Sequence, residues 1–122
     1  MLRLLLSVIL LSGLAWPARA LELVMVEQAG CAWCARWDRE VAPEYPLTEE
    51  GQAAPLRRID LHQPVPDDLV LQSRPRLTPT FVLVDDEGRE LGRIEGYPGE
   101  DFFWGLLGVL LERAGWSRTE QD

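Results

Sequence analysis

Leu21-Glu-Leu-Val-Met-Val-Glu-Gln-Ala-Gly-Cys-Ala-Trp-Cys34 joins a short apolar run to the only two cysteines of the chain. The run over residues 21–26 is rich in apolar and β-branched residues, which favours a buried strand. Residues 27–30 then turn the chain. The following residues predict a helix that begins at or next to Cys31 and runs to about Val41, before Pro43. The first expected unit is therefore a strand, a turn and a helix that carries both cysteines.

The Cys31–Cys34 pair has the spacing of a redox-active dithiol. Residues three apart lie on one face of a helix, with Cα atoms about 5 Å apart, and a disulfide tolerates that separation. At the start of a helix, free backbone N–H groups and the helix dipole stabilise a thiolate. The Cys31 thiolate can attack a substrate disulfide, and Cys34 can resolve the mixed disulfide that results. Reversible thiol–disulfide exchange is therefore the first functional hypothesis.

Other uses of the cysteine pair fit the sequence less well. A structural zinc site needs about four ligands, and the chain has two Cys and one His, His62. Covalent haem attachment needs His directly after the second cysteine, where this chain has Ala35. A purely structural disulfide would close so short a loop that it would remove little entropy from the unfolded chain. The structural bridge and a metal remain alternatives, and we expect no cofactor and no metal.

The N-terminus has the pattern of a secretory signal peptide. Met1-Leu2-Arg3 is a short positive start, residues 4–14 are almost wholly apolar, and Ala18-Arg19-Ala20 supplies a small-x-small cleavage site. The apolar run is shorter than the roughly 20 residues that a membrane-spanning helix needs, although an uncleaved anchor remains an alternative. We therefore expect residues 1–20 to be a signal peptide and residues 21–122 to form a single exported domain.

Composition narrows the classes of partner. The chain has 12 basic residues, all of them Arg, and 20 acidic residues, so the formal net charge is −8. Such a balance disfavours binding to nucleic acid and to anionic membrane surfaces. An exported domain that relied on disulfides for stability would usually carry several, so one close pair indicates a redox role. No segment suggests dimerisation, and we expect a monomer.

Apolar runs and turn residues divide the rest of the chain. We expect strands at 56–61, 80–84 and 90–95, a hairpin turn at 85–88, helical segments at 48–51 and 67–73, and a last helix at 100–114. A strand–helix–strand unit places its strands parallel, and a hairpin adds an antiparallel edge. The sequence therefore predicts an α/β domain with a small mixed sheet and helices on both of its faces.

In this order of elements the chain resembles proteins of the thioredoxin fold. The resemblance is carried by the buried strand before Cys31 and Cys34, by Thr78-Pro79-Thr80 before a strand, and by Gly96 after the hairpin. It implies that the Thr78–Pro79 bond is cis and lies beside the cysteine pair. It further implies that the backbone of Thr78 is free to pair with a substrate strand, which makes Thr78 and Pro79 substrate-binding residues.

Residues 26–38 and 42–51 are similar to the small periplasmic thioredoxins of bacterial sulfur-oxidation (Sox) systems. This resemblance implies a periplasmic, thioredoxin-like protein disulfide reductase with Cys31 and Cys34 as catalytic residues. Its substrate would be a cysteine of a partner protein such as a sulfur carrier, and its electrons would come from a membrane thiol transporter. Two alternatives remain: a redox-responsive binding module without turnover, and a disulfide oxidase or isomerase.

Two departures from cytoplasmic thioredoxins affect the chemistry. Those proteins have Gly-Pro between the cysteines, where this chain has Ala32-Trp33. They also carry a buried Asp six residues before the first cysteine, at the position of Met25, and its partner Lys has no counterpart in a chain without Lys. Glu27 and Asp38 are the nearest acids in the sequence, and neither can be assigned as the base for Cys34 from the sequence alone.

Several other residues need an interpretation. We expect Trp33 to be partly exposed and to face the substrate, whereas Trp37 belongs to the core. We expect His62 to lie on the surface and Tyr97 to be packed. The apolar residues of the last helix recur at helical spacing and are expected to be core: Phe102, Phe103, Trp104, Leu106, Leu107, Leu110 and Leu111.

Overall fold

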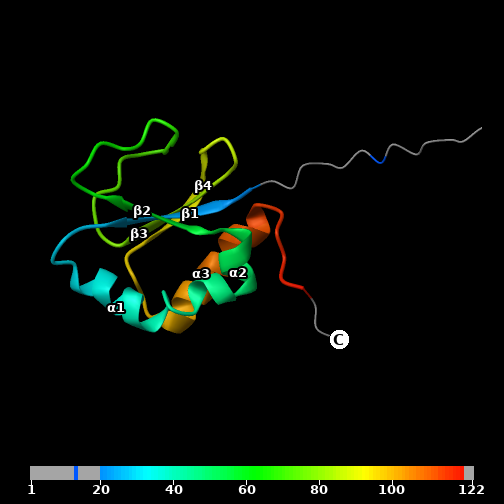
Figure 1. Ribbon diagram of the computed structural model, residues 1–122, viewed down its shortest axis with the longest axis horizontal. Coiled ribbons are helices and arrows are strands. Elements are labelled where there is room, and N and C mark those ends of the chain that lie inside the picture. Colours follow the sequence, from blue (N-terminus) through cyan, green and yellow to red (C-terminus); the bar gives the residue numbers. More distant parts are fainter. Residues whose placement is uncertain (1–12, 14–19, 120–122) are drawn as a thin grey trace, which may run out of the picture.

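A computed structural model describes residue 13 and residues 20–119; the expected signal peptide, residues 1–20, lies outside these residues apart from its positions 13 and 20. The elements are β1 (Glu22–Glu27), α1 (Ala32–Glu40), a 3-10 helix η1 (Tyr45–Leu47), α2 (Glu49–Ala53), β2 (Leu56–Asp60), β3 (Thr80–Val84), β4 (Glu90–Glu95) and α3 (Glu100–Arg113). Figure 1 shows the three α-helices gathered below the sheet. No helix in the described part of the chain is long and apolar enough to cross a membrane.

The four strands form one mixed sheet in the order β2-β1-β3-β4. β1 runs parallel to β2 and antiparallel to β3, with Leu23 opposite Leu56 and Leu83. β3 and β4 form the expected antiparallel hairpin. Its turn is closed by a hydrogen bond from the Gly88 N–H to the Asp85 carbonyl, and Gly88 has a φ of +76°, which favours glycine. The expected mixed sheet is confirmed.

The helices cover one face of this sheet, and this corrects the expectation of helices on both faces. Side chains of β1 alternate, so that Leu23 and Met25 pack against the helices while Val24 faces the opposite side. On that opposite side, Val24 and Val82 pack against Leu69, which belongs to the irregular segment 61–79. The segment lies above the sheet in Figure 1, away from the helices.

The helix expected at 67–73 is absent because the backbone of this segment is used in a contact with the hairpin. Val70 instead forms an isolated bridge with Arg89, in which its N–H donates to the Gly88 carbonyl and its own carbonyl accepts from the Glu90 N–H. Backbone groups that a helix would have paired internally are therefore used to fix the segment to the hairpin.

The last helix buries only one stripe of its apolar residues. Phe103, Leu107 and Leu111 are fully buried, at the four-residue spacing that repeats on one helix face. Phe102 and Leu106 are 70% and 45% exposed, so the expectation that they belong to the core is wrong. Trp104 and Leu110 are partly buried against the same core.

Aromatic packing fixes α1 on the sheet. Trp37 of α1 is fully buried, as expected, and its ring centroid lies 5.1 Å from that of Phe81 on β3 and 5.7 Å from that of Phe103 on α3. Phe81 and Phe103 themselves meet edge to face at 4.9 Å. Because Trp37 follows Cys34 by one helical turn, this packing also fixes the position of the cysteine pair.

Candidate active site at the start of α1

The two cysteines occupy chemically different places. Cys31 is the N-cap of α1 and is partly exposed, whereas Cys34 lies one turn into the helix and is only 4% exposed. They form a disulfide with a Cα–Cα distance of 5.2 Å. The backbone N–H of Cys34 donates to Cys31 Sγ at 3.1 Å, a contact that stabilises negative charge on that sulfur. The expected helix start is therefore confirmed.

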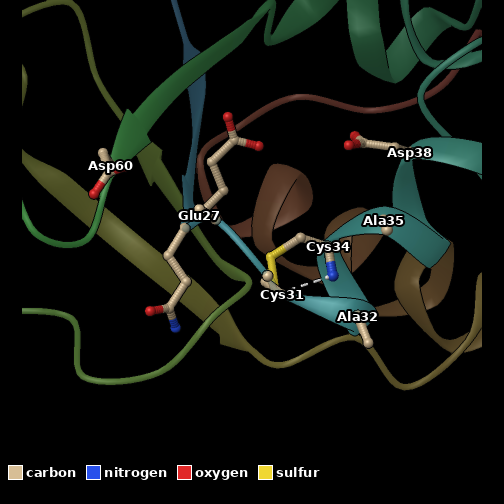
Figure 2. Close-up of a pocket in the computed structure, with 10 residues that line it drawn as sticks. Glu27, Cys31, Ala32, Cys34, Ala35, Asp38 and Asp60 are labelled. Atoms are coloured by element: carbon tan, nitrogen blue, oxygen red, sulfur yellow. Dashed lines mark hydrogen bonds between the residues drawn. A yellow bond between two sulfur atoms is a disulfide. The ribbon is translucent and has the colours of Figure 1, made fainter.

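An open pocket of about 550 Å³ lies beside the disulfide. Both cysteines line it together with three acidic residues, Glu27 from the end of β1, Asp38 from α1 and Asp60 from the end of β2. In Figure 2 the carboxylates of Glu27 and Asp38 lie on the same side of the disulfide and point toward one another. The sulfur pair thus faces a water-accessible space that is rich in carboxylates.

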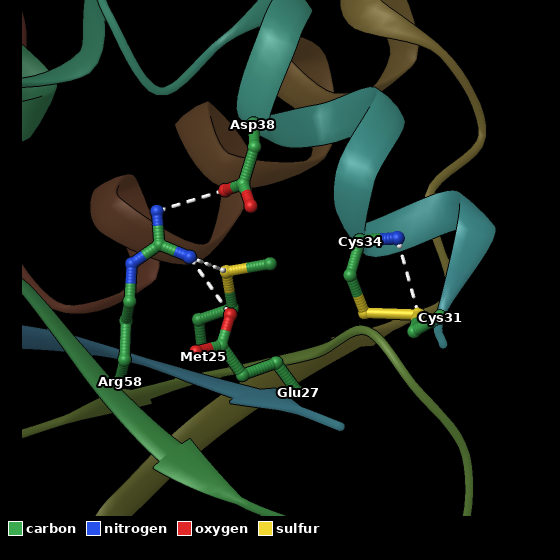
Figure 3. A network of polar contacts seen from close by, with 6 residues as sticks. All are labelled: Met25, Glu27, Cys31, Cys34, Asp38 and Arg58. Atoms are coloured by element: carbon green, nitrogen blue, oxygen red, sulfur yellow. Dashed lines mark hydrogen bonds and ion pairs between the residues drawn. A yellow bond between two sulfur atoms is a disulfide. The ribbon is translucent and has the colours of Figure 1, made fainter. Parts of the chain in front are cut away.

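Arg58 on β2 joins two of these carboxylates. Its Nη1 donates to Glu27 Oε2 and its Nη2 donates to Asp38 Oδ1, both at 2.8 Å. Figure 3 shows the guanidinium between the two acids, with Met25 Sδ within 3.7 Å of Nη1. The guanidinium carbon also lies 5.8 Å from the ring centroid of Trp37. The hydrogen bonds from Arg58 to Asp38 and Glu27 raise the pKa of Arg58, so it stays charged.

The sequence did not reveal this arginine. Met25 stands where the resemblance to cytoplasmic thioredoxins would place an acid, and Arg58 is its neighbour in the parallel register of β1 and β2. Two consecutive arginines, Arg57 and Arg58, do mark β2 in the sequence. Which of them faces the cysteines depends on strand register, and a single sequence does not give that register.

The Thr78–Pro79 peptide bond is cis, as expected, and is tied to the loop that precedes Cys31. Gln28 Nε2 donates to Thr78 Oγ1 at 2.8 Å, and Gln28 Oε1 bonds to Nε2 of the exposed His62 at 2.8 Å. The Pro79 carbonyl accepts from the Gly96 N–H at 2.7 Å. Among the described residues, the backbone N–H and C=O of Thr78 have no hydrogen-bond partner.

Trp33 lies between the two cysteines in the sequence and is exposed. Its side chain is 54% exposed, in agreement with the expected partial exposure. The guanidinium carbon of Arg36 lies 5.6 Å from the Trp33 ring centroid and 5.9 Å from that of Tyr97, and Arg36 pairs with Glu40 at 2.6 Å. The Tyr97 hydroxyl bonds to Glu40 at 3.2 Å. Burial and the Glu40 carboxylate raise the pKa of Tyr97 to about 12, so it remains a donor at neutral pH.

Together these groups can perform thiol–disulfide exchange. A partly exposed sulfur at a helix start and a buried second sulfur on the next turn are the arrangement that attack and resolution require.

Among the residues that the structure describes, no group of three or more His, Cys, Asp or Glu could hold a metal ion.

Comparisons with solved structures identify similar proteins. The periplasmic thioredoxin SoxS from Paracoccus pantotrophus, in its reduced form, is 54% identical, with a TM-score of 0.74 over 77% of this chain and 98% of that one. A thioredoxin-fold protein from Helicobacter pylori is 19% identical, with a TM-score of 0.52 over 75% of this chain and 66% of that one, and this likeness concerns the fold. No protein-family model and no curated protein sequence matches the chain.

Proposed function

The chain belongs to the family of periplasmic thioredoxins that includes SoxS, and we propose that it reduces disulfides of protein partners in the periplasm. The family supports thiol–disulfide oxidoreductase activity, and the reductive direction is our proposal. The observation that carries the proposed exchange chemistry is the unequal pair at the start of α1, with Cys31 partly exposed and hydrogen-bonded and Cys34 buried behind it. The similarity to SoxS supports the periplasmic location.

In the proposed reaction Cys31 is the nucleophile. Its thiolate attacks one sulfur of the substrate disulfide, a mixed disulfide forms, and the other substrate sulfur leaves as a thiolate that takes up a proton. Cys34 then attacks Cys31 Sγ and releases the second substrate sulfur. The substrate disulfide gains two electrons, and the Cys31–Cys34 pair loses them and ends as the disulfide seen in the structure.

Trp33, Thr78 and Pro79 are the proposed substrate-binding residues. The backbone N–H and C=O of Thr78, which have no hydrogen-bond partner within residues 20–119, can form strand-like hydrogen bonds with an extended substrate segment. Trp33 offers an exposed aromatic surface beside Cys31, held in place by Arg36. Both features are those of a site for a polypeptide, which supports a protein substrate.

The proposed partners follow from the family. We infer that the substrate is a cysteine of a sulfur-metabolism protein such as a sulfur carrier, and that a membrane thiol transporter supplies the electrons. The protein acts as a monomer in this proposal. The formal net charge of −8 adds a preference for a partner whose surface around its cysteine is basic.

Two measurements test the proposal. The wild-type protein should reduce insulin over many turnovers with dithiothreitol as reductant, and Cys31→Ser should abolish the reaction. Cys34→Ser, expressed in the native periplasm, should accumulate a mixed disulfide with its partner through Cys31. Redox-dependent binding without turnover would instead identify a regulatory module. Faster oxidation of unfolded proteins by the wild type than reduction of insulin would identify an oxidase.

A further inference from the structure

We propose that Glu27 and Asp38, held in place by Arg58, form the proton acceptor for the Cys34 thiol in the resolving step. The inference rests on the proposed function, because it assumes that Cys34 attacks a mixed disulfide on Cys31. It assigns a role to the acidic pocket that the cysteine chemistry alone does not use.

The first support is the shared pocket. Glu27, Asp38 and Cys34 come from two elements, β1 and α1, and line the same open space. With about 550 Å³ the pocket has ample room for a water molecule between a carboxylate and the sulfur. The other charged groups there are Asp60, which lines the pocket from β2, and Arg58. Figure 2 shows both carboxylates on one side of the sulfur pair.

The second support is that each carboxylate has a free oxygen. Arg58 bonds to Oε2 of Glu27 and to Oδ1 of Asp38. Within residues 20–119, Glu27 Oε1 and Asp38 Oδ2 have no hydrogen-bond partner. Arg58 is itself fixed by the sulfur of Met25 and the ring of Trp37, as Figure 3 shows for Met25. Arg58 is therefore a positioning residue that orients two acceptors and leaves one oxygen of each available.

The proposed step balances within the site. The Cys34 S–H proton passes through a pocket water to Glu27 Oε1 or Asp38 Oδ2, and the electron pair left on Cys34 forms the bond to Cys31 Sγ. The bond between Cys31 and the substrate sulfur breaks, and the substrate leaves as a thiolate that is protonated from solvent. The carboxylate then returns its proton to water, so no further oxidant or reductant is consumed.

A purely electrostatic role for the two acids predicts the opposite result. If the carboxylates acted only through their charge, replacing them by amides would leave Arg58 as an uncompensated cation near Cys34. A cation favours the thiolate, so resolution would become faster. If the carboxylates accept the proton, the same replacement makes resolution slower. The sign of the effect therefore separates the two roles.

The test uses the whole reduced protein and 5,5′-dithiobis(2-nitrobenzoate). Attack by Cys31 releases one thionitrobenzoate, and attack by Cys34 on the resulting mixed disulfide releases the second. In the E27Q/D38N variant we expect the second release to slow at least about tenfold near pH 6.5, since general-base catalysis contributes about 10²–10⁴-fold. The second release should also become proportional to hydroxide concentration, whereas the first release should not slow, because losing two negative charges in the pocket that Cys31 also lines favours the Cys31 thiolate.

A matched control exists on the same two strands. Arg57 joins Glu22 and Asp68 as Arg58 joins Glu27 and Asp38, but neither acid of that pair lines the pocket beside the disulfide. The E22Q/D68N variant makes the same change of charge, and we expect it to leave both releases unchanged.

Three results would overturn the inference: a second release that is unchanged or faster in E27Q/D38N, an equal slowing in E22Q/D68N, or an equal slowing in D60N. The last result would show that the overall charge of the pocket matters, because Asp60 lines it without a bond to Arg58. Failure of the proposed function looks different. In that case the wild-type protein itself would not reduce insulin.

Discussion

At the scale of residues, Cys31 and Cys34 lie three positions apart in the sequence but in very different environments. Cys31 lies at the N-cap with solvent on one side, and its sulfur accepts a hydrogen bond from the backbone of Cys34. Cys34 packs into the core beside Trp37. A helix N-terminus favours a thiolate, whereas burial in apolar surroundings disfavours one. We therefore expect the sulfur of Cys31 to attack first and that of Cys34 to resolve the mixed disulfide.

This difference predicts unequal alkylation. In the reduced protein at pH 7, we expect iodoacetamide to modify Cys31 at least about tenfold faster than Cys34. The Cys31 rate should reach half its maximum below the roughly pH 8.5 that is typical of a free thiol. Peptide mapping by mass spectrometry after timed quenching measures both rates. Equal rates, or faster modification of Cys34, would contradict the assignment of Cys31 as nucleophile.

Tyr97 predicts a pH dependence of stability. Its pKa is about 12 in the folded protein and about 10 in an unfolded chain. Because the folded state holds the proton more tightly, this contribution is complete below pH 10 and is lost as the pH rises from 10 to 12. Tyr97→Phe should remove that part of the alkaline loss. Urea unfolding of both oxidised proteins at pH 9 and pH 11.5 measures it; an identical loss in both would refute the prediction.

At the scale of elements, the strands were predictable because each is marked by a local run of apolar and β-branched residues between turn residues. Residues 80–84 are fully buried and all but Thr80 are apolar, and both β3 and β4 begin and end where the sequence places them. The one-sided burial of α3 was not predictable in the same way. All of its apolar residues have helical spacing, and only the packing of the helix on the sheet separates buried Phe103 from exposed Phe102. The path of the segment 61–79 was not predictable either, because it depends on the bridge between Val70 and Arg89, which are far apart in the sequence.

A pair of glycine substitutions tests the packing of the helices. A Cβ at Gly51 in α2 would overlap the backbone carbonyl of Tyr45, so Gly51→Ala should lower the free energy of unfolding by about 1–3 kcal/mol. Gly105 in α3 has no heavy atom within 4 Å of its Cβ position. Gly105→Ala should therefore raise that free energy by about 0.5–1 kcal/mol through helix propensity. Urea unfolding measures both, and a stabilising Gly51→Ala would contradict the close contact.

At the scale of the whole molecule, the site combines a part that is local in the sequence with a part that is not. Cys31, Trp33 and Cys34 lie within one turn at the start of α1, so the candidate redox pair could be predicted from spacing. The contact of Arg58 with Glu27 and Asp38 joins three elements and depends on the register of two strands. Thr78 is likewise brought to the loop before Cys31 by Gln28 across fifty positions. These long-range contacts required the folded structure.

The direction of electron flow is a property of the molecule in its compartment. An oxidising periplasm would leave Cys31 and Cys34 as a disulfide unless electrons are supplied, so a reductant must be kept reduced by a donor. We therefore expect acid quenching and maleimide gel-shift assays to find part of the wild-type protein reduced in growing cells. If the proposed donor is a membrane thiol transporter, deleting that transporter should leave the protein wholly oxidised, with a C31S/C34S variant as the unshifted control. A wholly oxidised wild-type protein would reverse the assigned direction, because the same two thiols can accept electrons from substrates as readily as donate them.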